Sequence, residues 1–174
     1  MPISLLIPAL FALVYPGCLA WAAVSDFRSM TIPNRLTLAL AVAFVPVALM
    51  LQFPLSQWGI HLGLGLAGLV LGMILFSLRF MGGGDAKLIA AASLWLGLQG
   101  FAALLIYTAL AGGVLTLGLL FARKNFHPYA AGLPGVISRH LEPQGDIPYG
   151  IAICAGGLCA ILQSDILPLL VRST

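Results

Sequence analysis

Long apolar runs, separated by short polar or turn-rich breaks, make up most of this chain. A membrane-spanning helix needs about 20 mostly apolar residues, and six runs approach that length. The predicted spans cover about residues 3–24, 36–51, 58–78, 85–98, 101–122 and 147–171. Only Gln99 and Gly100 separate the fourth run from the fifth, so these two also fit one bent or re-entrant unit. No basic residue precedes the first run, which favours a membrane helix over a cleaved signal peptide.

Composition supports a membrane protein. Hydrophobic residues make up 61% of the 174 residues and charged residues only 7%, whereas a soluble domain is about 25% charged. A soluble fold of this size cannot hide so much apolar surface. We therefore expect an all-α integral membrane protein, a bundle of about six transmembrane helices forming a single membrane-embedded domain over residues 1–174.

The basic residues indicate the orientation of these helices. With six alternating spans, seven of the eight fall in breaks on one face: Arg28, Arg35, Arg79, Lys87, Arg123, Lys124 and Arg139. The positive-inside rule assigns that face to the cytoplasm and both termini to the outside of the plasma membrane. A nucleic-acid partner is not expected, because the charges follow loops and form no basic stripe.

The small residues and the cysteines are predicted to have structural roles. Gly59 with Gly63, and Gly68 with Gly72, have the spacing that lets membrane helices pack closely. The three cysteines lie in apolar runs without a C-x-x-C pair, so we predict buried free thiols and no metal or other cofactor. Residues 125–144, the only long mixed polar stretch, are predicted as a cytoplasmic loop.

Two of the five acidic residues join a predicted span to a specific local pattern. Asp85 follows Gly82, Gly83 and Gly84, and three glycines indicate an exposed, flexible backbone that can bring a substrate strand near the acid. Asp26 ends the first span. Acids near hydrocarbon cost free energy and are functional candidates by default. The simpler alternatives are a helix-capping Asp85 and an Asp26 paired with Arg28 in a solvated loop.

Alternation of six spans places Asp26 and Asp85 on the same face at similar depth. Two converging carboxylates share one proton, because both cannot ionise cheaply side by side. One then acts as a general base on a water molecule, and the other as a general acid toward the carbonyl or the leaving amine. This chemistry is that of an aspartic protease and needs no metal.

Four motifs carry a family resemblance. Gly82-Gly83-Gly84-Asp85 resembles the G-x-G-D signature of intramembrane aspartic proteases. The Asp26-x-Arg28 pattern followed by Ile32-Pro33-Asn34, the Lys87 that follows G-x-G-D, and the Pro148-Tyr149-Gly150 motif are similar to type IV prepilin peptidases. Together these motifs span most of the chain.

The resemblance implies a peptidase that cleaves short basic leaders from type IV prepilins (Flp/Tad-like pilins) or archaeal preflagellin-like proteins. It implies Asp26 and Asp85 as the catalytic pair at the cytoplasmic face. Larger family members carry paired C-x-x-C motifs and also N-methylate the new terminus. This sequence lacks those motifs, so we expect a minimal peptidase without methyltransferase activity.

Roles of the supporting residues stay open. Lys87 could stabilise an aspartate anion, bind lipid phosphate, or act as a positive-inside anchor. Arg28 is expected to be an anchor, His140 a solvated loop residue, and Tyr149 either a site residue or an interfacial aromatic. Two other functions remain: a small cation transporter or channel using both aspartates, and a structural membrane subunit.

Overall fold

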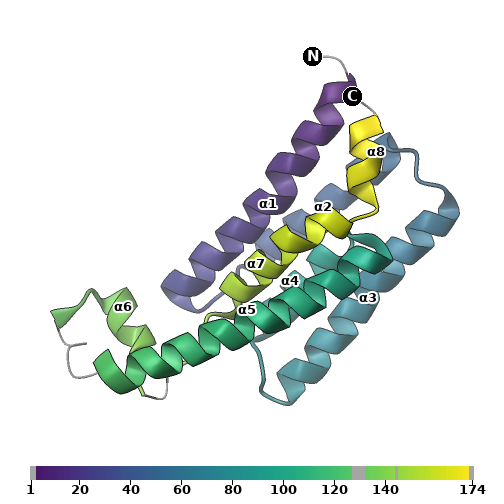
Figure 1. The fold of residues 1–174 in the computed structure, drawn as a ribbon. Helices are drawn as coiled ribbons and strands as arrows, with labels where there is room; N and C mark the ends of the chain where they lie inside the picture. The colour runs from purple at the N-terminus through teal and green to yellow at the C-terminus, as the bar shows by residue number, and fades with distance from the viewer. Residues whose placement is uncertain (1–2, 127–131, 144, 173–174) are drawn as a thin grey trace.

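The chain folds into a bundle in which all described regular structure is helical. The computed structural model describes residues 3–126, 132–143 and 145–172. Its helices are α1 (Ile3–Ser29), α2 (Asn34–Met50), α3 (Leu55–Ser77), α4 (Gly83–Ser93), α5 (Gly97–Phe126), α6 (Gly135–His140), α7 (Tyr149–Ala160) and α8 (Ile166–Arg172), with the 3-10 turn η2 at Ile161–Gln163 (Figure 1).

Two of these helices have the length and composition of membrane spans. They are α3, with 23 residues, and α5, with 30. Helix α2 and the stretch Tyr149–Gln163 are apolar but shorter. Large apolar side chains are exposed on both long helices, including Leu66 and Met73 on α3 and Val114 on α5. These observations fit a helical membrane protein, while the count of six spans stays a prediction.

Two of the predicted span boundaries are wrong. Helix α4 ends at Ser93, and the break lies at residues 94–96, so Gln99 and Gly100 belong to the first turn of α5. Gly97 has a φ of 70°, a conformation that glycine adopts without steric cost. The sixth predicted span is also interrupted, because η2 and the residues Ser164 and Asp165 separate α7 from α8.

The stretch 125–144 is only partly the loop that we predicted. Helix α5 continues to Phe126, and Gly135–His140 form α6, which lies beside the ends of α1 and α5 (Figure 1). Residues 127–131 and 144 of this stretch lie outside the described part of the chain.

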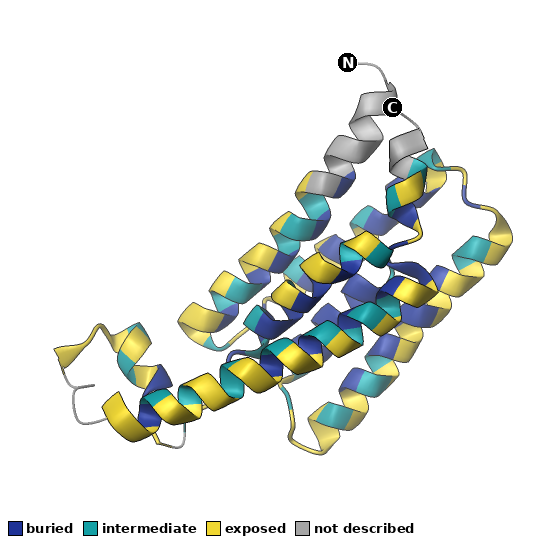
Figure 2. Ribbon diagram, in the orientation of Figure 1, coloured by how far each residue is buried: buried dark blue, intermediate teal, exposed yellow. Residues whose placement is uncertain are grey.

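The short helix α4 lies at the centre of the bundle. It packs against α2, α3 and α7, and α7 in turn packs against α1 and α5. Leu88, Ala92 and the adjoining Trp95 have no exposed surface. The long α3 and α5 are exposed along their outer faces and buried toward the middle (Figure 2). This arrangement brings the end of α1 and the starts of α4 and α7 together.

Close helix packing explains some of the glycines. A Cβ on Gly72 would lie 2.6 Å from the Ala86 Cα, and one on Gly68 would lie 2.8 Å from the Ser93 Oγ. The predicted small-residue contact of this pair is therefore confirmed, with α4 as the neighbour. The prediction is wrong for Gly59 and Gly63, which have open space where a Cβ would stand.

Candidate functional site

Asp26 lies in the last turn of α1 and is fixed by the start of α7. Its side chain is 6% exposed, and its Oδ2 accepts a hydrogen bond of 2.7 Å from the Gly150 backbone N–H. A Cβ on Gly150 would lie 2.8 Å from the Cβ of Asp26. The glycine of the Pro148-Tyr149-Gly150 motif is thus required because any side chain there would displace the carboxylate.

Asp85 lies in the first turn of α4 and is also 6% exposed. Its Oδ2 accepts a hydrogen bond of 3.0 Å from the Gly82 N–H, a reach-back bond that is common at helix starts. The predicted capping role is therefore real. It uses only one oxygen, since the buried Oδ1 has no hydrogen-bond partner among the described residues. A buried polar atom without a partner is rare and often marks a functional site.

The three glycines before Asp85 act through close contacts and not through unusual backbone angles. None of them has a positive φ, so their backbone angles are open to other residues as well. A Cβ on Gly82 would lie 3.1 Å from the Asp85 Oδ2, and one on Gly84 would lie 3.1 Å from the Ile32 Cβ. The glycines let the backbone approach both the acid and the Ile32-Pro33-Asn34 turn.

Both carboxylates line one cavity of about 520 Å³, which we call the aspartate cavity. Its other walls come from the α1–α2 connection, the end of α3 with the α3–α4 connection, and the segment leading into α7: Met30, Phe76, Arg79, Phe80, Met81, Gly82, Gly145, Asp146, Ile147 and Tyr149. A second cavity of about 200 Å³ lies between the two acids, the three glycines and Asn34. The predicted convergence of Asp26 and Asp85 on one cavity is confirmed.

A buried arginine and histidine connect α5 and α6 to the end of α1. The Arg123 Nε donates to the His140 carbonyl and its Nη2 to the Asp146 carbonyl, both at 2.8 Å. The His140 Nε2 lies 2.8 Å from the Phe27 carbonyl, and its ring stacks on Phe27 at 4.6 Å between centroids. His140 is 4% exposed, so its prediction as a solvated residue is wrong.

These contacts had no recognisable signal in the sequence. Arg123 follows the positive-inside pattern, and His140 lies in a polar stretch, so composition alone suggests solvent exposure for both. Their contacts fix the backbone on two sides of the aspartate cavity. His140 bonds to Phe27, which follows Asp26, and Arg123 bonds to Asp146, which precedes the segment leading to Gly150.

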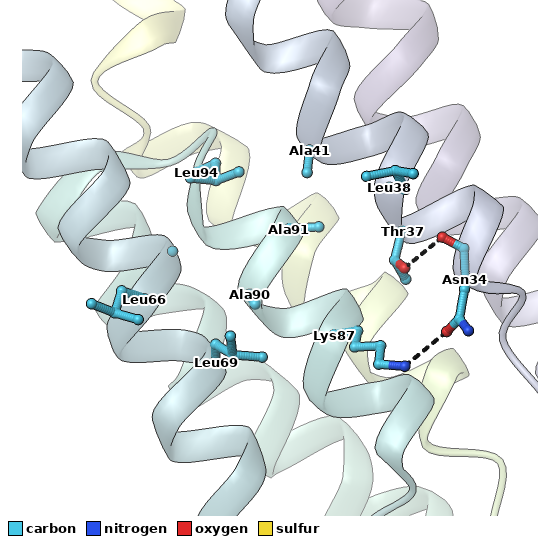
Figure 3. A pocket seen from close by; sticks show the side chains of 11 residues that line it. Asn34, Thr37, Leu38, Ala41, Leu66, Leu69, Lys87, Ala90, Ala91 and Leu94 are labelled. Atoms are coloured by element: carbon cyan, nitrogen blue, oxygen red, sulfur yellow. Dashed lines mark hydrogen bonds between the residues drawn. The ribbon is translucent and has the colours of Figure 1, made fainter.

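Lys87 does not face the aspartate cavity. Its Nζ donates to the Asn34 Oδ1 at 2.9 Å, on the side of α4 that lines a separate apolar groove (Figure 3). This Lys87 groove has a volume of about 550 Å³ and lies between α2, α3 and α4. Contact between Lys87 and an aspartate, one of its predicted roles, is therefore absent from the structure.

The other predicted supporting residues have different positions. Tyr149 lines the aspartate cavity. Pro33 and Pro148 are the N-cap residues of α2 and α7, where the N–H that proline lacks is not needed for a helical hydrogen bond. Arg28 is exposed, and its carbonyl accepts a bond of 3.4 Å from the Arg139 Nη1.

The chain is similar to known proteins over most of its length. Residues 13–117 match a family model described as the type IV leader peptidase family. A prepilin leader peptidase/N-methyltransferase of Bacillus subtilis (strain 168) is 28% identical, with 88% of this chain and 56% of that protein covered. Proteins with the same description from Aeromonas salmonicida (strain A449) and Aeromonas hydrophila are 29% and 30% identical, with 84% of this chain and 48% of theirs covered.

The chain therefore spans about half the length of the curated relatives that it matches. No solved structure matches it.

Proposed function

The chain belongs to the type IV leader peptidase family, and we propose that it is a membrane-embedded aspartic endopeptidase that cleaves the leader peptide of type IV prepilins. Asp26 and Asp85 are the catalytic residues of this proposal. The observation that carries it is that the two buried carboxylates, 59 positions apart in the sequence, line one polar cavity.

The hydrogen bonds suggest a division of roles between the two acids. Asp26 accepts the shorter bond, from an N–H that favours its ionised form. It is the proposed general base, which takes a proton from the attacking water. Asp85 keeps one buried oxygen without a protein partner, and a proton on that oxygen can be donated to the scissile carbonyl. In the second step Asp26 gives the proton taken from water to the leaving amine as the C–N bond breaks, and Asp85 regains its proton from a hydroxyl of the tetrahedral intermediate as the carboxyl group forms.

Three acids and one base, Arg79, line the cavity, so its walls suit a peptide that carries positive charge. Asp146 is exposed and lines the cavity together with both catalytic acids. A basic leader would meet these carboxylates, and the exposed Gly82 leaves room for the substrate backbone. Flp/Tad-like pilins and preflagellin-like proteins are the proposed substrates.

The proposed orientation places the cavity at the cytoplasmic face of the plasma membrane, with both termini outside. Arg28, Arg35, Arg79 and Lys87 are exposed near the cavity end of the bundle, as the positive-inside rule requires. A transporter would instead keep its acids at broken helices near the midplane. Asp26 and Asp85 lie at a helix end and a helix start.

The test is single replacement of each acid in cells that express a prepilin. We expect Asp26→Asn and Asp85→Asn each to lower the rate of leader cleavage by about 10³-fold or more, because general acid–base catalysis contributes on the order of 10²–10⁴-fold. The matched control is Asp165→Asn, an exposed acid near the other end of α7. Normal processing by either cavity variant, when both are folded in the membrane, would refute the proposal.

A further inference from the structure

We propose that the apolar segment of the substrate, next to the scissile bond, binds in a groove between α3, α4 and α5. This inference rests on the proposed function and extends it to a binding site. The α3–α5 groove has a volume of about 480 Å³ and is lined by Leu71, Leu75, Phe80, Met81, Ile89, Leu105, Thr108, Ala109, Gly112, Gly113, Thr116, Leu117 and Tyr149.

Continuity with the aspartate cavity is the first argument for this occupant. Phe80, Met81 and Tyr149 line both the groove and the aspartate cavity. A chain that leaves the two acids past these three side chains therefore enters the groove directly. A peptide whose basic leader lies in the polar cavity would therefore place an apolar stem that follows the leader in the groove.

The shape of α5 is the second argument. Ala109, Gly113 and Thr116 follow each other at helical spacing, so they lie on one face of α5 and line the groove. A Cβ on Gly113 would meet no atom within 4 Å. This face is open and has small side chains, and small residues allow a membrane helix to approach closely. An apolar helix can insert its side chains here at three- and four-residue spacing.

The Lys87 groove is the rival site for an apolar segment. It is of similar size and carries an ammonium group at one end, where the Lys87 Nζ bonds to Asn34. It shares no lining residue with the aspartate cavity of about 520 Å³, and it meets the smaller cavity between the acids only at Asn34. A stem bound there would have to reach the acids around the side of α4 that carries Lys87 and Asn34. The α3–α5 groove needs no such detour.

Two glycine variants on the same helix provide the first test. Gly113→Leu fills the groove, whereas Gly118→Leu places the same side chain on the opposite side of α5; both positions have open space for a Cβ. With a full-length prepilin in liposomes, we expect Gly113→Leu to cleave at least about tenfold more slowly than Gly118→Leu, because overfilling a packed apolar contact costs on this scale. Equal rates from two folded variants would overturn the inference.

Photo-crosslinking gives a second readout that does not depend on a rate. Ala109→p-benzoylphenylalanine probes the α3–α5 groove, and Leu66→p-benzoylphenylalanine probes the Lys87 groove. Val114→p-benzoylphenylalanine probes the outer face of α5, where Val114 is exposed. Each is combined with Asp85→Asn, so that the substrate stays uncut. We expect crosslinks to the stem at Ala109 at several times the yield of the other two. A higher or equal yield at Leu66 or Val114 would overturn the inference.

The two proposals fail in distinguishable ways. If the unaltered protein does not cleave the prepilin, the proposed peptidase function is wrong. If the unaltered protein cleaves it, while the two glycine variants cleave equally and the crosslinks do not favour Ala109, the peptidase stands and the α3–α5 groove is not the binding site.

Discussion

The aromatic cluster in the core and the aspartate cavity are built in opposite ways. Around Trp95, the rings of Phe11, Tyr15 and Phe44 lie at 5.7, 5.8 and 5.9 Å between centroids. Trp95 has no exposed surface, and its Nε1 donates to the Leu40 carbonyl at 3.0 Å. The interior of the cluster is thus filled, and its one polar ring atom is satisfied.

The aspartate cavity, by contrast, is unfilled, and its two acids are positioned by hydrogen bonds from the backbone. Each acid accepts a bond from a glycine N–H, the cavity has a volume of about 520 Å³, and one oxygen of Asp85 has no partner among the described residues. Filled packing stabilises a fold, whereas unsatisfied acids are retained for chemistry. Stability and proposed catalysis thus lie in separate parts of one bundle, which single substitutions can test.

The largest expected effect on stability is at the cluster. Trp95→Ala should lower the free energy of unfolding by about 3–5 kcal/mol, since it deletes a large buried side chain and leaves a cavity. Thermal or denaturant unfolding in detergent measures this loss. The molecules that remain folded should still cleave prepilin, because Trp95 does not line the aspartate cavity. A normal unfolding midpoint with lost cleavage would contradict the division between the two regions.

A smaller effect on stability, together with a loss of cleavage, is expected at Gly150. Gly150→Ala places a Cβ 2.8 Å from the Asp26 Cβ, so the carboxylate must move. Misplacement of a catalytic group by about 1 Å can cost roughly 10²-fold in rate. We expect a loss of cleavage on that scale, together with a fall in the free energy of unfolding of about 1–3 kcal/mol, because the Cβ–Cβ contact also pushes α1 and α7 apart.

The matched control for Gly150 is Gly17→Ala, on the same helix as Asp26, where a Cβ meets nothing within 4 Å. It should cleave prepilin at the normal rate. If both glycine variants lose activity equally, helix propensity and not the contact with Asp26 is responsible, and the account of the glycine motif is wrong.

The aspartate cavity and the aromatic cluster also differ in how well the sequence predicts their residues. Asp26 and Asp85 could be found because a chain with five acids makes each one conspicuous near an apolar run. Their convergence followed from helix alternation alone. The partners of the aromatic cluster could not be found, because Phe11, Phe44 and Trp95 are far apart in the sequence and an apolar run does not indicate which of its residues face the protein.

The sequence also failed to predict where helices end. The run from 85 to 122 is apolar almost throughout, so hydropathy carries no sign of the break at residues 94–96. Gly97, whose φ is 70°, begins α5 just after the break, but one glycine among 20 does not mark a break in the sequence. Arg123 and His140 were missed for a different reason: both bind backbone carbonyls, and such contacts have no side-chain partner that a sequence pattern could reveal.

The smallest effect on cleavage is expected at Lys87. A substitution there tests whether Lys87 lies outside the aspartate cavity. The motif position suggests a contact with the acids, but the structure bonds the Lys87 Nζ to Asn34 in another groove. Lys87→Met keeps the length of the apolar stem and removes the charge. An exposed polar contact of this kind contributes about 0–1 kcal/mol, so cleavage should change less than about fivefold. The assay is the prepilin cleavage rate across pH, with Arg35→Met as the control for loss of one positive charge at the same face. A displaced pH profile for Lys87→Met alone would mean that its ammonium acts on the acids, and that the separation between the aspartate cavity and the Lys87 groove is wrong.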